Sequence, residues 1–173
     1  MNKFLEATIR LFGTPKWAIL RAQRLSAIKK RFPDGKVSPH CHITEFFCRD
    51  GMPPPIRALN HLQWYAKNII EPMRVIYGPC MISGPYRHYW YNKNVVHGAT
   101  LSWHVWDRYV DGTVPGSELA CDLSFATGLP DQWAKTASTL LRKLGRGGGV
   151  GIYRKSRFTH VDTRHNSARW VGN

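Results

Sequence analysis

Acidic residues are scarce in this sequence. The 173 residues include 11 Asp and Glu against 25 Lys and Arg, which gives a formal net charge of +14 at pH 7. This excess favours polyanionic partners: nucleic acid, an anionic membrane surface, or a cell wall that carries carboxylates and phosphates. Charge predicts the sign of the partner and leaves its chemistry open.

Cysteine is scarce as well. The chain has four cysteines at irregular spacing, and none belongs to a C-x-x-C pair. This pattern argues against a disulfide framework and favours synthesis in a reducing compartment. Cys41 and Cys48 are close enough in sequence to bridge if the protein meets an oxidising compartment, provided that the local geometry allows it.

Long apolar runs are absent. No stretch approaches the ~20 residues needed to span a bilayer, so we expect no transmembrane segment. Residues 4–12 are interrupted by Glu6 and Arg10 and no small-residue cleavage site follows, so we expect synthesis in the cytoplasm without a signal peptide. Without internal repeats, the chain has room for one ordinary domain, or for one domain with an extension.

Residues 1–36 predict a basic helical N-terminal extension of two helices. Pro15 suits the first position of the second helix, in which Leu25, Ile28 and Phe32 recur at helical spacing. Its basic face suits a membrane-surface or docking helix, but a solvated face on a helix packed against the domain is the interpretation we favour. The turn signal at 33–35 marks a boundary, so residues 37–173 form the main domain.

Periodicity predicts the main elements of that domain. Helical spacing covers 56–77, with a kink or break at Pro72, and covers 130–144, with Gly145 as the cap. Strand patterns occur at 81–83, 101–106 and 118–125, and in the last segment around His160. The aromatic run 89–91 lies among basic residues and could stack bases. No nucleic-acid-binding module accompanies it, so nucleic acid is not an expected partner.

Two histidines and one aspartate are candidate metal ligands. A catalytic zinc usually takes three protein ligands from imidazoles and a carboxylate and leaves its fourth position open. His104, Asp122 and His160 supply such a set. In a chain with eight histidines they could also be unrelated core or surface groups, so the surrounding motifs decide.

Six segments, in order, resemble the D-Ala-D-Ala carboxypeptidase family of zinc peptidases, whose fold is shared with the Hedgehog signalling domain and many phage endolysins. The resemblance runs from Ile43 to Trp170. Its segments are 43–51, 68–74, Ser83-Gly84-Pro85-Tyr86-Arg87 through Asn92, Ser102-x-His104 with Ala120-x-Asp122, 149–153, and 158–164 closing at 168–170.

The resemblance implies an α+β domain with an antiparallel sheet and flanking helices. It implies Zn²⁺ held by His104, Asp122 and His160, and hydrolysis of peptidoglycan peptides. Arg87 takes the position that in the family holds the substrate carboxylate or the developing oxyanion, duties that suit a guanidinium. Tyr86 and Ser102, from the same motifs, are expected at the substrate site.

Two positions depart from the family pattern. The family places its aspartate seven positions after the first histidine, which here is Asp111 in a glycine-proline loop. We favour Asp122, because a strand holds a ligand more rigidly, and interpret 107–117 as an insertion. Relatives carry an acid or histidine just before the last ligand, where this chain has Arg157 and Phe158. Asp162 is then either the general base or the partner that orients His160.

The sequence therefore predicts a zinc metallopeptidase acting on bacterial peptidoglycan, as a phage endolysin or a virion-associated lysin. Residues 1–36 could dock such a protein to other virion proteins. The alternative is a non-catalytic structural or binding virion protein that retains the peptidase fold, because fold does not fix function. Which peptide bond is cut stays open.

Overall fold

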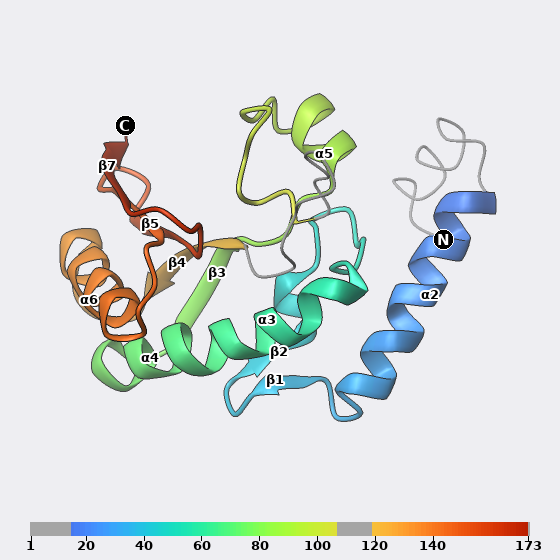
Figure 1. The fold of residues 1–173 in the computed structure, drawn as a ribbon, viewed down its shortest axis with the longest axis horizontal. Coiled ribbons are helices and arrows are strands. Elements are labelled where there is room, and N and C mark those ends of the chain that lie inside the picture. Colours follow the sequence, from blue (N-terminus) through green and yellow to red (C-terminus); the bar gives the residue numbers. More distant parts are fainter. Residues whose placement is uncertain (1–14, 107–118, 173) are drawn as a thin grey trace.

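The computed structural model describes residues 15–106 and 119–172, which form a mixed helical and sheet structure (Figure 1). Its main sheet has five strands in the order β3-β4-β6-β5-β7. These strands are β3 (Cys80–Gly84), β4 (Ala120–Phe125), β5 (Gly149–Tyr153), β6 (Phe158–Asp162) and β7 (Ala168–Gly172). Only β5 and β7 pair in parallel, so the expected α+β class with a mainly antiparallel sheet and flanking helices is confirmed.

The two faces of the central strands differ in chemistry. Successive strand residues point to opposite faces, and Cys121 and Leu123 of β4 and Val161 of β6 belong to the hydrophobic core. The alternate positions carry Asp122 and His160, which are direct partners in the β4–β6 register. The pattern of strand residues therefore brings a carboxylate and an imidazole together on the face turned away from the core.

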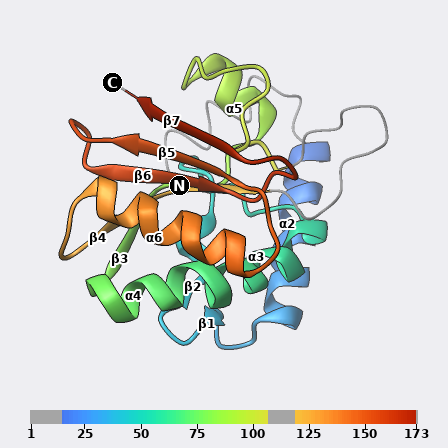
Figure 2. The same cartoon turned by 60° about the vertical axis from the view of Figure 1, so that its left-hand side comes forward.

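Helix α6 (Pro130–Lys143) covers the core face of β5 and β6 (Figure 2). Pro130 occupies the start of the helix, where a missing N–H costs nothing, and Trp133, Ala137 and Leu141 are buried against the sheet. Gly145 follows the helix with φ +66°, a conformation that glycine adopts readily. The predicted helix and its cap are confirmed.

The helix predicted over 56–77 is observed as four joined helical pieces. They are η2 (Ile56–Ala58), α3 (Leu59–Tyr65), the π-helical η3 (Ala66–Ile70) and α4 (Glu71–Tyr77). The N–H of Glu71 donates to Ala66 O in the wider π pattern, and Pro72 follows at once. Pro72 has no N–H to donate, and it stands where the π turn has just ended. The missing hydrogen bond therefore falls at the junction, and the helical chain continues into α4.

The N-terminal helix α2 (Pro15–Arg31) packs on the same core. Ile28, and Phe32 just beyond the helix, belong to the core. The buried Arg24 guanidinium donates to Pro53 O at 2.8 Å and to the Tyr86 hydroxyl at 2.9 Å. The first of the two expected helices lies outside the described residues. None of the helices in 15–106 and 119–172 combines the length and apolar character needed to cross a membrane.

A small hairpin and two short helices complete the fold. The hairpin pairs β1 (Lys36–Ser38) with β2 (Cys41–His42), and η1 (Ile43–Phe46) follows it. The aromatic run lies in α5 (Tyr89–Asn94). All four cysteines are free, and burial raises the pKa of Cys48 to about 12 and that of Cys41 to about 11.

The strand predicted over 101–106 is wrong. This segment forms turns, in which Ser102 N donates to Ala99 O and Val105 N donates to Ser102 O. The strand predicted next to it, β4, already pairs with β3 on one side and with β6 on the other. With both of its edges taken, 101–106 cannot add to it. The consecutive residues Val105 and Trp106 are buried, Leu101 is exposed, and the turn brings His104 Nε2 to within 3.2 Å of His160 Nδ1 on β6.

Leu141→Ala should destabilise the protein by about 2–5 kcal/mol, because Leu141 is fully buried and its truncation leaves a cavity between α6 and the sheet. Leu144→Ala, at a residue 37% exposed just beyond the same helix, should cost less than about 1 kcal/mol. Urea unfolding of both variants measures the difference. Equal losses would show that α6 does not pack as described.

Candidate metal centre

Three side chains from separate elements converge beside the sheet. His104 comes from the turn after α5, Asp122 from β4 and His160 from β6. Nε2 of His104 lies 3.2 Å from Nδ1 of His160. Asp122 Oδ1 lies 2.9 Å from the same His160 nitrogen and 3.3 Å from His104 Nε2. All three residues are buried, with exposed fractions of 5% to 8%.

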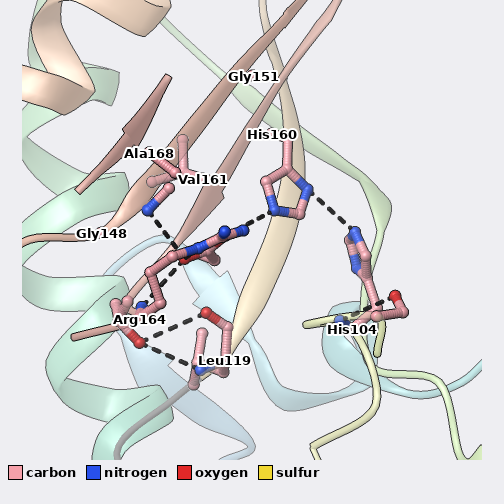
Figure 3. Close-up of polar contacts among 12 residues, drawn as sticks. His104, Leu119, Gly148, Gly151, His160, Val161, Arg164 and Ala168 are labelled. Carbon is pink, nitrogen blue, oxygen red and sulfur yellow. Dashed lines mark hydrogen bonds and ion pairs between the residues drawn. The ribbon is translucent and has the colours of Figure 1, made fainter. Parts of the chain in front are cut away.

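The hydrogen-bond partners of the two rings identify the nitrogens that face the centre. Nδ1 of His104 lies 3.2 Å from Pro85 O, a pure acceptor, so this nitrogen carries the proton and Nε2 presents a lone pair. Nε2 of His160 lies 3.1 Å from Asp162 Oδ2, so in the neutral ring Nδ1 presents a lone pair. Figure 3 shows these two nitrogens pointing toward each other, joined by a dashed line. Together with Asp122 Oδ1, these two nitrogens direct three lone pairs toward one point.

This arrangement fits a zinc ion. Ligand atoms about 2.0–2.2 Å from a tetrahedral zinc lie about 3.3–3.6 Å apart. The separations of 2.9, 3.2 and 3.3 Å are close to that spacing. Two imidazoles and one carboxylate are also a donor set that zinc accepts in catalytic sites, where a fourth position stays open. The donors therefore fit the metal in chemistry and in spacing.

Without a cation the charges of the cluster favour a proton on His160 over one on His104. Burial lowers the pKa of His104. Burial also opposes protonation of His160, but the hydrogen bonds and charges of Asp122 and Asp162 outweigh it and raise its pKa. Burial works against ionisation of Asp122 too, and the histidines nevertheless hold its pKa well below the usual range. A proton on His160 is thus the substitute for a metal ion between these groups.

Asp162 lies on the far side of the His160 ring from the convergent atoms. It is fully buried, and its Oδ1 accepts the Gly149 N–H at 2.8 Å. Its Oδ2 faces His160 Nε2 at 3.1 Å and accepts from Arg164 Nη2 at 2.5 Å. A carboxylate with these partners fixes the orientation and tautomer of the histidine, as such groups do at many metal centres.

Arg164 extends this support outward. Its Nε also donates to Asp162 Oδ1 at 2.9 Å. The guanidinium lies 4.8 Å from the ring centroid of Trp103 and 5.3 Å from that of Trp170, and the Trp170 ring is 5.3 Å from that of His160. Stacking on aromatic faces holds a guanidinium in place. Arg164, Trp103 and Trp170 thus form a brace for Asp162, which the sequence reasoning missed.

Gly84 makes room for the centre. A Cβ at this position would lie 2.0 Å from Asp122 Oδ2 and 2.8 Å from Asp122 Cβ. Gly84 pairs with Asp122 in the β3–β4 register, at an irregularity of the ladder. The Ser83-Gly84 motif in the sequence therefore has a steric reason, because no larger residue fits beside this ligand.

The other predicted site residues lie near the centre in different ways. Arg87 Nη2 is 3.8 Å from Asp122 Oδ2, and its backbone N donates to His104 O at 2.8 Å. Ser102 Oγ accepts from the His104 N–H at 3.4 Å. The Tyr86 side chain is fully buried and points to Arg24. Asp111, the alternative ligand, lies outside the described residues.

A small pocket adjoins Arg87. It encloses about 110 Å³, and its lining includes Arg49, Arg87 and Tyr91. Arg49 Nη2 donates to Ser83 O at 3.0 Å, so this second guanidinium is anchored at the rim. Arg49 could not be predicted from the sequence as a neighbour of the centre, because only the fold brings residue 49 to strand β3.

A second group in the described part of the chain has metal-ligand atoms within 4.8 Å of one another: Cys48, Asp50 and His88. Here both nitrogens of the histidine ring have partners. Nδ1 of His88 accepts the Tyr91 N–H at 3.4 Å, so Nε2 carries the proton and donates to Asp50 Oδ2 at 2.5 Å. The contacts describe a hydrogen-bonded pair that caps α5, and the lone pairs do not converge as they do at His104.

Comparisons of the chain with protein-family models, with curated proteins and with solved structures find no match.

We expect the full chain to bind one equivalent of zinc, which His104→Ala, Asp122→Ala or His160→Ala abolishes. His165→Ala, at an exposed histidine, and His88→Ala should keep it. Metal analysis after dialysis against a weak chelator measures the stoichiometry. Retention of zinc by the Asp122→Ala variant would show that this carboxylate is not a ligand.

Weakening the support of His160 should lower zinc affinity without removing a ligand. Asp162→Asn and Arg164→Gln should each reduce the affinity about 10- to 100-fold, as changes to partners of metal-bound histidines do. Arg154→Gln is the matched control, since Arg154 makes a comparable ion pair with Asp131 at 2.6 Å on the surface. Competition with a chromophoric chelator gives the affinities, and an unchanged value for Arg164→Gln would rule out the brace.

Proposed function

We propose that this protein is a zinc-dependent peptidase that hydrolyses peptidoglycan peptides. The observation that carries the proposal is the convergence of lone pairs from His104 Nε2, His160 Nδ1 and Asp122 Oδ1 at mutual distances of 2.9 to 3.3 Å. Those three residues would hold the zinc. When bound there, zinc supplies a Lewis acid for the scissile carbonyl group.

Arg87 supports the peptidase proposal because it adds a fixed positive charge beside the ligands. Its Nη2 lies 3.8 Å from Asp122 Oδ2, and its backbone is tied to that of His104. A guanidinium keeps its charge at every working pH and donates hydrogen bonds in a planar fork. Arg87 would bind the carboxylate of the substrate, or the negative charge that develops on the scissile oxygen.

Of the two roles open to Asp162, the contacts favour the orienting one. Both of its oxygens are occupied by donors from His160, Arg164 and Gly149, and none of the side chain is exposed. A general base must reach the proton that it removes. Asp162 is separated from the ligand atoms by the His160 ring, so its part in catalysis would be to hold that ring.

The choice of peptidoglycan rests on the ordered resemblance to the D-Ala-D-Ala carboxypeptidase family and on the charge of +14, which suits an anionic wall. A phage endolysin or virion-associated lysin is the proposed setting. The exposed basic end of α2 at Lys29, Lys30 and Arg31 would contact other virion proteins.

One observation favours the non-catalytic alternative. Arg157 and Phe158 stand where relatives carry an acid or histidine, and Phe158 stacks on Tyr153 with the ring centroids 4.3 Å apart. A structural virion protein that retains the fold would bind zinc without turnover. Measuring hydrolysis separates the two proposals, whereas measuring bound metal does not.

Purified peptidoglycan incubated with the zinc-loaded protein should release new amino groups. A strong chelator should stop the release and added zinc restore it. Arg87→Ala should lower kcat by about 10²- to 10³-fold, the range for losing one donor to a developing oxyanion. Arg154→Gln should leave the rate unchanged, because Arg154 lies at a surface pair with Asp131. No release with any divalent metal would contradict the enzymatic proposal.

A further inference from the structure

A second hollowed surface lies on the face of the sheet that carries α6. Residues paired across the parallel β5–β7 ladder share a face, so Arg169 and Val171 accompany Val150 and Ile152 on the α6 side. Trp170 pairs with Gly151 on the side of the metal centre. Figure 2 shows β7 at the outer edge of the sheet, with α6 lying along β5 and β6. A groove remains between α6 and this edge.

The groove is lined by cations and hydroxyl groups. It encloses about 610 Å³ between the end of α6, the glycine turn after it and the start of β7. Its polar side chains are Lys135, Ser138, Thr139, Arg142, Arg146, Ser167 and Arg169. No acidic residue lines it among the described residues. Four positive charges around one hollow favour an anionic ligand.

Two of the four cations are held in place. The Arg146 guanidinium lies 4.7 Å from the ring centroid of Trp64. Nη1 of Arg169 donates to Gly148 O and to Ala168 O, both at 2.7 Å. A guanidinium has five N–H donors, and these bonds use only those of one Arg169 nitrogen. Donors held by such contacts lose less conformational entropy when a ligand binds.

The acid on the same helix does not neutralise the groove. Asp131, in the first turn of α6, receives two hydrogen bonds from Arg154, at 2.6 and 2.9 Å. Its charge is therefore engaged at the opposite end of the helix from Arg142. The basic last turn of α6 also adds Arg142 where the helix dipole is negative, which stabilises the cation there.

We propose that this groove binds the phosphate groups of a linear polyol-phosphate chain of the cell wall. Arginine forks match the oxygens of a phosphate, and the hydroxyl groups of Ser138 and Ser167 are suited to donate beside them, whereas the Thr139 hydroxyl donates to Lys135 O at 3.0 Å. No aromatic ring lines this groove, and single-stranded nucleic acids depend on such rings for base stacking. A phosphate chain without bases is therefore the occupant that fits.

The groove opens on the sheet face opposite to the one that carries Asp122 and His160. A chain held there leaves the metal centre accessible, so binding and hydrolysis would act on separate parts of the wall. The binding proposal does not depend on catalysis.

The test uses an oligomer of glycerol phosphate as the probe and calorimetric titration of the full chain. Four contacts should give a slope of about −3 for log affinity against log salt, using the value for flexible single strands. The double variant Arg142→Gln/Arg146→Gln should bind at least about tenfold more weakly and flatten the slope by about half. The matched control Lys143→Gln/Lys155→Gln removes the same net charge from exposed positions outside the groove and should bind as the wild type does.

Three further measurements separate a loss of oligomer binding from a loss of folding and from a loss of catalysis. Lys135→Gln/Arg142→Gln leaves the Arg146–Trp64 contact intact and should lose affinity equally, with an unchanged melting temperature. His104→Ala should bind the oligomer normally even if the protein proves not to be a peptidase. Equal losses in the groove variants and in the lysine control would overturn the site, and tighter binding of single-stranded DNA of equal phosphate number would assign the groove to nucleic acid instead.

Discussion

The register between β4 and β6 is the constraint on which the site depends. It sets Asp122 directly opposite His160, and a slip of either strand by one position would turn that strand's member of the pair toward the hydrophobic core. Cys121, Leu123 and Val161 on the core face prevent such a slip, since they pack against α6 and the 56–77 helical stretch. The apolar face of each strand thus determines where the residues of its polar face lie. A turn then places His104 beside Asp122 and His160.

The electrostatics of the cluster follow from its depth. Two imidazoles and a carboxylate share a space of low polarity, and each ring is fixed by an acceptor behind it, Pro85 O for His104 and Asp162 for His160. Asp162 is itself neutralised by Arg164, which rests on two indole rings. The orientation of His160 is therefore fixed by a series of contacts that runs inward from the two indole rings through Arg164 and Asp162.

Much of the fold could be predicted because its signals are local. The α6 helix has a proline at its start, an apolar face and a glycine after its end, and β4 and β6 alternate clearly. The segment 101–106 alternates as well and is not a strand, because the pattern does not reveal that β4 has no open edge. Likewise His104, Asp122 and His160 could be proposed from their motifs. The brace of Arg164 and the approach of Arg49 could not, because they join residues that only the tertiary fold makes neighbours.

The convergence of His104, Asp122 and His160 in a buried place has a thermodynamic consequence. Three lone pairs held together in a buried place repel one another, so the folded chain is strained unless a cation or a proton lies between them. A metal ion that binds the folded form alone adds about 2.7 kcal/mol to its stability when its free concentration is a hundred times the dissociation constant. The stability of the folded chain would then rise with the concentration of a metal ion that binds this cluster.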